Sequence, residues 1–243
     1  MISTPSVLEM MKSGVHFGHQ TSRWHPKMAP YIYGAKNGVH VIDLEKTIAQ
    51  LNEVQNFINN VVSKGGSILF LGTKNQVQPV IKREAERCGM PYVTEKWIGG
   101  FFTNFPVVIK LTKKYKELVS KREKGEFKKY TKKEQLDFTR EIEKLEKAIF
   151  GVKDMEKLPE AIFVWDVRTE KTAINEALKK KIPVIGICDT NVNPTPIDYV
   201  IPSNDDATKA IELIITHIAD CVLAAKKDIK PLPETKQEKT NKK

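Results

Sequence analysis

The chain has 243 residues, enough for one large domain or two small ones, and either could bury a hydrophobic core. Hydrophobic residues make up 40% of it and charged residues 29%, as in a soluble globular protein, and no apolar run approaches the ~18 residues that span a bilayer. The cysteines Cys88, Cys188 and Cys221 are far apart, and the first eleven residues lack the basic-then-apolar order of a signal peptide. We therefore expect a cytosolic protein with reduced thiols and no membrane contact.

The first 42 residues are predicted to form a docking segment, because they hold too few aliphatic side chains for a core of their own. Ser6 and Glu9 have the spacing of a capping box, which predicts a short helix. Residues 15–30 are punctuated by Gly and Pro and rich in rings and basic groups, so we expect an irregular segment. A small β-hairpin is then predicted around Asn37 and Gly38.

Residues 43–103 and 153–225 alternate between strand and helix patterns. Asp43 is the predicted N-cap of a long helix. Continuous apolar runs, the pattern of strands buried on both faces, begin at Ile68, Ala161, Pro183 and Tyr199. Because strands and helices follow one another, these two segments predict one α/β domain with a doubly wound parallel sheet covered on both faces.

Residues 104–152 are predicted to form an antiparallel helical hairpin inserted into that domain. Apolar side chains recur at steps of three and four on both arms, the spacing of a short coiled coil. They are Val108, Leu111, Tyr115 and Leu118 on the first arm and Phe138, Ile142, Leu145, Ile149 and Val152 on the return arm. Gly125 interrupts the pattern, and Thr131 with Glu134 forms a capping box that restarts the helix. Two short arms joined by a tight tip can bury these seams only against each other.

The net charge of +10 is concentrated in two stretches. Residues 110–147 carry 14 basic and 8 acidic side chains, a net of +6, and residues 226–243 carry 7 and 3, a net of +4. The first arm and tip, residues 110–133, hold 11 basic and 3 acidic groups, which favours binding of a polyanion such as nucleic acid. A solvated helical face is the alternative, and it fits the acidic return arm well. The tail, 226–243, is polar and lysine-rich and is predicted to be disordered.

Two regions hold the candidate RNA-binding residues. In the N-terminal region cations alternate with rings around Trp24, a pattern that suits stacking and phosphate contact in folded RNA, although Trp24 could instead belong to the core. The N-terminal candidates are His16, His19, Arg23, Trp24, His25, Lys27 and Lys36. The hairpin candidates are Asn104, Lys110, Lys113, Lys114, Lys121, Arg122, Lys128 and Lys129.

Two other kinds of site compete with RNA binding. His16 and His19 are spaced like metal ligands, with His25 as a conceivable third, but no cysteine or obvious carboxylate accompanies them. The predicted strand ends carry groups that could hold Mg²⁺ and a phosphate in an enzyme: Thr73, Lys74, Asp166, Asp189, Asn191, Asn204, Asp205 and Asp206. Neither phosphate-binding glycine motif occurs, and the last two acids also suit a helix cap and first turn. We therefore expect no catalysis, no metal or cofactor, and no small-molecule substrate.

Short motifs along the chain resemble a known family. The run GVHFGHQT at 14–21, with Trp24, Pro26, Lys27 and Met28 behind it, strongly resembles the opening of the bacterial small-subunit ribosomal protein two family. The likeness continues in the family's order through NGVH at 37–40, DLEKT at 43–47, GTK at 72–74, WIGG at 97–100, EKLE at 143–146, GVKDM at 151–155, IPV at 182–184, DTN at 189–191 and NDDA at 204–207. The chain departs from the pattern at Phe101, Phe102 and Trp165, positions that concern core packing.

The resemblance implies a fold, a location and a set of partners. It implies a flavodoxin-like sheet with a protruding helical hairpin, in a non-catalytic, cytoplasmic, ribosome-bound protein that supports translation. Such a protein lies between the head and body of the small subunit and touches ribosomal RNA mainly through its N-terminal part and hairpin. It has neighbouring small-subunit proteins as partners, and in many bacteria it helps to anchor the large messenger-binding protein.

Overall fold

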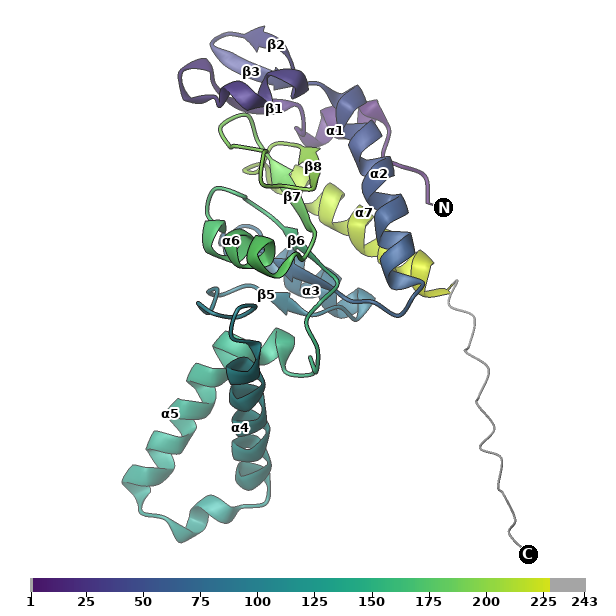
Figure 1. Cartoon of the computed structure of the whole chain (residues 1–243). Coiled ribbons are helices and arrows are strands. Elements are labelled where there is room, and N and C mark those ends of the chain that lie inside the picture. Colours follow the sequence, from purple (N-terminus) through teal and green to yellow (C-terminus); the bar gives the residue numbers. More distant parts are fainter. Residues whose placement is uncertain (1, 228–243) are drawn as a thin grey trace, which may run out of the picture.

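A five-stranded parallel sheet forms the centre of the computed structural model, which describes residues 2–227 (Figure 1). Its strands are β4 (Ile68–Leu71), β5 (Tyr92–Val93), β6 (Ala161–Val164), β7 (Val184–Cys188) and β8 (Tyr199–Pro202). They lie in the order β5-β4-β6-β7-β8, so the second strand along the chain is at the edge and the first beside it. This 2-1-3-4-5 order is that of flavodoxin-like folds, and the predicted α/β parallel sheet is confirmed.

Helices cover both faces of the sheet. One face packs against α2 (Leu44–Val62), α3 (Gln78–Cys88) and α7 (Thr208–Lys227), and the other against α6 (Lys171–Lys180) (Figure 1). Successive strand residues alternate between the two hydrophobic cores, since Phe70 and Phe163 belong to the first and Leu69 and Ile162 to the second. Every side chain of β4 and β6 is buried, which explains their uninterrupted apolar sequences.

The N-terminal module (residues 2–42) lies over the carboxyl ends of β7 and β8 (Figure 1). It contains α1 (Val7–Ser13) and an antiparallel sheet of β1 (Phe17–Gln20), β3 (Val39–Ile42) and β2 (Ile32–Lys36). The predicted capping box and β-hairpin are confirmed. The expectation of an irregular segment at 15–30 was wrong in part, because β1 and two 3-10 helices, Thr21–Arg23 and Pro26–Tyr31, lie within it.

The hairpin (residues 104–152) consists of two helices that project from the molecule beside β5, at the edge of the sheet farthest from β8 (Figure 1). They are α4 (Phe105–Glu123) and α5 (Lys132–Ile149), joined by a 3-10 turn, Glu126–Lys129, and followed by another, Phe150–Val152. The capping box at Thr131 is present as predicted. All nine predicted seam residues are buried or partly buried in one cluster, with Ile142 completely inaccessible. The apolar spacing therefore identified the packed face of both helices correctly.

A carboxylate of α6 holds the chain where it enters the hairpin. The Glu176 side chain accepts hydrogen bonds from Trp97 Nε1 at 3.1 Å, Gly100 N at 2.8 Å and Phe102 N at 2.9 Å. Glu176 is only 7% exposed, so several donors compensate its loss of hydration. This contact fixes the start of the hairpin against the α/β domain.

At the C-terminus, Lys226 and Lys227 belong to α7, so the prediction of disorder was wrong for these two residues. The remainder of that predicted tail, 228–243, lies outside the described residues. Among residues 2–227, no helix is long and apolar enough to cross a membrane.

Candidate nucleic-acid interface

The N-terminal candidates lie in the loops and strands of the N-terminal module. Arg23 and Lys36 are exposed. Trp24 is 39% exposed and its ring centroid lies 5.2 Å from that of His40, so this tryptophan is a surface residue and not part of the core. The backbone N–H of His25 donates to Thr190 O at 2.8 Å, which ties the segment to the loop after β7. An exposed cation, Arg23, and an exposed ring, Trp24, are thus adjacent in sequence on an anchored segment, and Lys36 is exposed at the end of β2.

Of three other N-terminal candidates, His19 and Lys27 have side-chain partners within the protein and His16 is partly buried. Burial lowers the pKa of His16, which favours its neutral form. His19 Nδ1 lies 3.1 Å from Asp189 Oδ1, and this hydrogen bond raises the pKa of His19 against the opposing effect of burial. Lys27 Nζ donates to Thr195 Oγ1 at 2.8 Å. These three side chains therefore hold the N-terminal module against the sheet or offer RNA less charge than their sequence suggests.

The strand ends gather a cluster of charged groups around His19. Lys74 Nζ lies 3.7 Å from Asp205 Oδ1 and also forms an ion pair with Asp206. Asp205 is 5% exposed and its Oδ1 accepts no hydrogen bond from residues 2–227. Burial, reinforced by the neighbouring charge of Asp189, raises the pKa of Asp205 to about 7. The cluster links loops that follow three different strands to the N-terminal module.

The same cluster contains the one set of possible metal ligands found among the described residues. His19, Asp205 and Asp206 offer ligand atoms within 4.8 Å of one another. The histidines do not form the set considered from sequence, since neither His16 nor His25 joins it. One imidazole and two carboxylates are donors that Zn²⁺ accepts, but the Lys74 ammonium already pairs with both acids.

The hairpin candidates form a different kind of surface. Lys114 pairs with Glu141 on the opposite helix. The other basic candidates are exposed and, within residues 2–227, form no ion pair: Lys110, Lys113, Lys121, Arg122, Lys128 and Lys129. Of the two tip aromatics, Phe127 is turned inward and stacks on Phe138 with centroids 4.9 Å apart, whereas Tyr130 is 48% exposed. Asn104 is exposed just before α4 and its side chain does not cap that helix.

The strand-end acids considered for catalysis serve the loops that carry them. Asp166, which has a φ of 67°, accepts from Arg168 N at 3.0 Å and from Thr169 Oγ1 at 2.7 Å. Glu170 accepts from Thr73 N at 3.1 Å, and Asn204 Oδ1 accepts from Asp206 N at 2.8 Å. Asn204 is therefore the residue that turns the chain into α7. The carboxylates of Asp166 and Glu170 are thus satisfied by donors of nearby loops and lie outside the charged cluster around His19.

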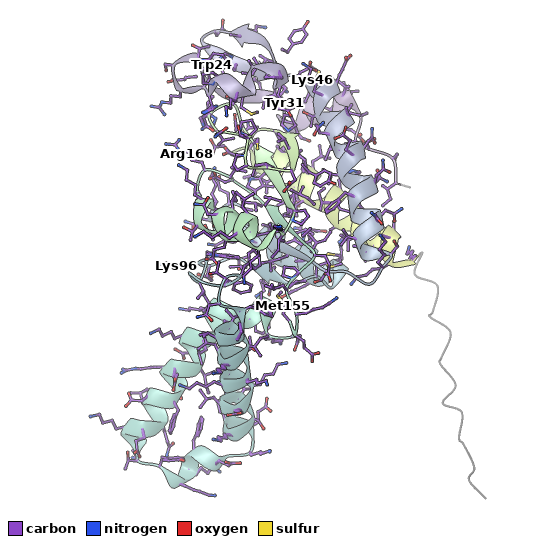
Figure 2. All side chains as sticks on the ribbon, viewed as in Figure 1. Trp24, Tyr31, Lys46, Lys96, Met155 and Arg168 are labelled. Carbon is purple, nitrogen blue, oxygen red and sulfur yellow. The ribbon has the colours of Figure 1, made fainter. Side chains whose placement is uncertain are left out.

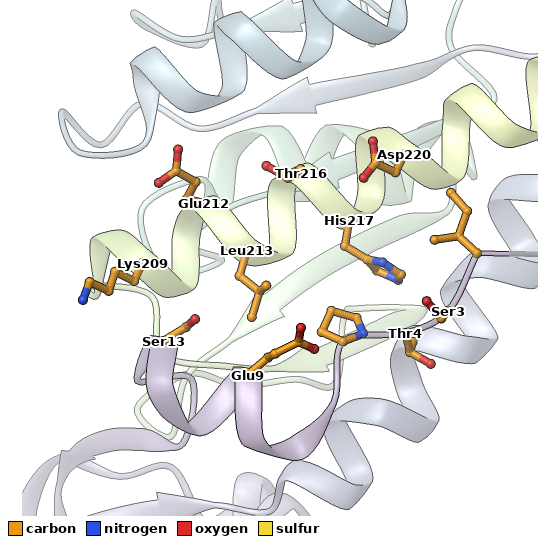
Figure 3. Close-up of a pocket in the computed structure, with 12 residues that line it drawn as sticks. Ser3, Thr4, Glu9, Ser13, Lys209, Glu212, Leu213, Thr216, His217 and Asp220 are labelled. Atoms are coloured by element: carbon orange, nitrogen blue, oxygen red, sulfur yellow. The ribbon is translucent and has the colours of Figure 1, made fainter.

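A groove of about 530 Å³ between α1 and α7 is also unsuited to RNA (Figure 3). Three carboxylates, Glu9, Glu212 and Asp220, line it against one ammonium, Lys209. Its histidine, His217, is buried, and burial lowers its pKa, so it adds little positive charge. The field of this groove repels phosphate.

The fold is that of an α/β protein, and exposed basic groups lie on its hairpin and its N-terminal module. This arrangement is typical of proteins that bind nucleic acid. Residues 10–225 match the protein family described as Ribosomal protein S2. The small ribosomal subunit protein uS2 of Coprothermobacter proteolyticus is 51% identical over 215 residues, which cover 88% of this chain and 80% of that relative. The chain belongs to the ribosomal protein S2 family.

Family membership confirms the resemblance seen in the short motifs. It makes the chain a structural constituent of the small ribosomal subunit, and not an enzyme, with the cytoplasmic, ribosome-bound location that this role entails. Ribosomal RNA and neighbouring ribosomal proteins are therefore its partners at the level of class.

Proposed function

We propose that the chain supports translation by binding small-subunit ribosomal RNA through two separate surfaces. The hairpin surface consists of Lys110, Lys113, Lys121, Arg122, Lys128 and Lys129. The N-terminal surface consists of Arg23, Trp24, His25 and Lys36. The other sequence candidates have supporting roles in this proposal: His19, Lys27 and Lys114 have partners within the protein, His16 is partly buried, and Asn104 carries no charge.

The observation that carries the proposal is that these six hairpin cations are exposed and form no ion pair within the part of the chain that the structure describes. An ammonium already paired with a carboxylate gains little from a phosphate, whereas a free one releases condensed counterions when it binds RNA. The seam side chains hold α4 and α5 together from inside, so the cations can face outward without weakening the hairpin core. The surface is thus ready to bind without a costly rearrangement.

The N-terminal surface adds contacts of another type. The Trp24 ring contacts the His40 ring, and more than a third of the Trp24 surface is exposed to solvent. Such a ring could stack on an unpaired base, a contact worth about 1–3 kcal/mol, while Arg23 meets a neighbouring phosphate. Stacking depends less on salt than charge pairing does, so the two surfaces should respond differently to ionic strength.

The position in the subunit and the organisation of the chain complete the proposal. The chain lies between head and body, contacts neighbouring small-subunit proteins and helps to anchor the large messenger-binding protein, as the family resemblance implies. Residues 1–42 act as the docking segment, 43–103 and 153–225 as the α/β domain, and 104–152 as an inserted coiled coil that reaches RNA. Residues 226–243 add a basic tail.

Charge reversal on the hairpin tests the proposal. The triple variant Lys113→Glu, Lys121→Glu and Lys128→Glu should weaken binding to small-subunit ribosomal RNA most at low salt. Each lost phosphate contact should reduce the slope of log affinity against log salt by about 0.7–0.9. A matched control, Lys12→Glu, Lys64→Glu and Lys209→Glu, changes the same charge at exposed positions outside both surfaces. Equal losses in the two triple variants would show that only the overall charge matters and would contradict the proposed surface.

A further inference from the structure

A pocket of about 410 Å³ lies at the carboxyl ends of β6 and β7, between the N-terminal module and α6. Its polar lining combines three basic side chains with three amides: His25, Arg168, Lys171, Asn175, Asn191 and Asn193. Among residues 2–227, no carboxylate lines it. In this respect it is the opposite of the acidic groove between α1 and α7.

The acids nearest to this pocket in sequence are held by other partners. Asp166, two residues before Arg168, accepts hydrogen bonds from the backbone of its own loop. Glu170, immediately before Lys171, is buried and accepts from Thr73 Oγ1 across the sheet. Arg168 and Lys171 are exposed and form no ion pair with any residue in 2–227. Their positive charge is therefore not neutralised by the acids beside them.

Two further features add hydrogen-bond donors to the pocket. Helix α6 begins at Lys171 with no side chain capping it, so the positive end of its dipole and its first free N–H groups lie at this border. Asn193 Oδ1 accepts from Thr195 N at 3.1 Å and Thr195 Oγ1 at 2.8 Å, which leaves the NH₂ group of Asn193 free to donate. Cations combined with neutral donors suit a phosphate group, since its oxygens accept several hydrogen bonds and its charge complements the guanidinium.

We propose that this pocket binds a backbone phosphate of small-subunit ribosomal RNA, with Arg168 and Lys171 as its principal cationic ligands. The inference rests on the proposed RNA-binding function and extends it to a third contact surface. Trp24, Arg168 and Lys96 lie along the same edge of the molecule in Figure 2. The pocket also shares His25 with the N-terminal surface, so RNA bound at Trp24 is already close to it. The α/β domain thus contacts RNA directly and does more than hold the other two surfaces apart.

The test compares two double variants of the same helix region in the full-length chain. Arg168→Ala with Lys171→Ala removes the charge at the pocket, and Lys179→Ala with Lys180→Ala removes the same charge at the other end of α6, where both lysines are exposed. The probe is small-subunit ribosomal RNA transcribed in vitro, titrated at several salt concentrations. The pocket variant should bind about tenfold more weakly, with a salt slope reduced by about 0.7–0.9 for the one lost phosphate contact. The control should change affinity less than about twofold.

The outcomes separate this inference from the function on which it rests. If the wild type binds the RNA and the hairpin triple variant loses affinity, but the pocket variant does not, the pocket proposal is wrong and the proposed function stands. If the wild type does not bind, both are wrong. Equal weakening of the two α6 variants, or a loss of subunit association by the pocket variant at unchanged RNA affinity, would assign the pocket to general charge or to a protein partner and overturn the proposal. Unchanged thermal unfolding of both variants shows that they are folded.

Discussion

The hairpin and the N-terminal module both gather basic groups, but they use them in different ways. On the hairpin an apolar seam supplies the packing, and most lysines form no ion pair with any of the described residues 2–227. In the N-terminal module His19 and Lys27 contribute to attachment, through Asp189 and Thr195. A cation that holds a fold together is less available to RNA than one that the fold does not need. Basic composition therefore indicates RNA binding more directly for the hairpin than for the N-terminal module.

The largest expected effect concerns the apolar seam that packs α4 against α5, because this packing does not depend on the lysines of the hairpin. Ile142 is completely buried, so Ile142→Ala should cost the hairpin about 4 kcal/mol, within the usual range for a large-to-small core substitution. Hydrogen exchange should speed up in α4 and α5 and stay unchanged in α2 and α7, which pack on the opposite face of the sheet. Leu136→Ala, at an exposed position of α5, is the control. Faster exchange throughout the protein would mean that hairpin and sheet unfold as one unit.

The second prediction concerns the charged groups that attach the N-terminal module. The pKa of Asp205 is raised to about 7 in the folded state, so the folded protein binds more protons than the unfolded chain between about pH 4 and pH 7, and stability falls as pH rises through that window. The raised pKa of His19 acts in the same direction. The stability that protonated His19 contributes is fully present below about pH 6.5 and is lost as the pH rises through the folded-state pKa. Asp205→Asn should remove the cost of burying an ionised carboxylate. It should therefore stabilise the protein by about 2 kcal/mol at pH 8, with little effect at pH 4.

Chemical denaturation across this pH range measures that prediction. Asp137→Asn, at an exposed carboxylate of α5 away from this cluster, is the control, and the fall in stability between pH 4 and pH 8 should persist in it. If Asp205→Asn destabilises the protein equally at pH 4 and pH 8, the contact with Lys74 outweighs the cost of burying the charge. The ionised carboxylate would then stabilise the folded protein, contrary to this prediction.

The parts of the fold with local signals could be predicted from sequence. Apolar runs placed β4, β6 and β7, and steps of three and four identified the buried seam of α4 and α5. The strand β1 was missed because Phe17–Gln20 contains one large apolar residue and pairs with β3 some twenty residues away. No local pattern reveals a partner at that separation, and a hydrogen-bonded polar strand looks like a loop.

The candidate site was predictable to a smaller extent, for the same reason. Composition indicated which regions are basic, but pairing decides which cations are free. His19 meets Asp189 from 170 positions away, and Lys114 meets Glu141 across the hairpin; neither contact leaves a trace in the neighbouring sequence. Phe127 turns inward although its neighbours are lysines, because Phe138 offers it a stacking surface. Arg168 and Lys171 were overlooked since each lies within two residues of an acid in the sequence, and only the structure shows those acids engaged elsewhere.

The third prediction tests whether the N-terminal surface binds RNA without being needed for folding. Arg23→Glu with Trp24→Ala removes one exposed cation and one partly exposed ring, so the isolated protein should lose less than about 1–2 kcal/mol of stability. Incorporation into small subunits should fall at least about tenfold, which requires a loss of only about 1.4 kcal/mol in binding. Thermal unfolding and sedimentation with subunits, on one preparation, measure both effects. A large drop in melting temperature would mean that the Trp24–His40 contact is structural, and normal incorporation would mean that the surface does not dock.

The smallest expected effect compares two adjacent lysines of α4 that differ in their partners. Lys113 is exposed and unpaired within residues 2–227, whereas Lys114 forms an ion pair with Glu141. Lys113→Ala should therefore lower the salt slope of RNA binding by about 0.7–0.9, the loss of one phosphate contact. Lys114→Ala should change the slope less and instead remove a surface ion pair worth about 0–1 kcal/mol to the hairpin. Since both variants lose one positive charge from the same helix, any difference between their slopes reports pairing and not net charge. Identical slopes would show that the Lys114–Glu141 pair opens freely when RNA binds. An ion pair within the hairpin would then not make a lysine less available to RNA.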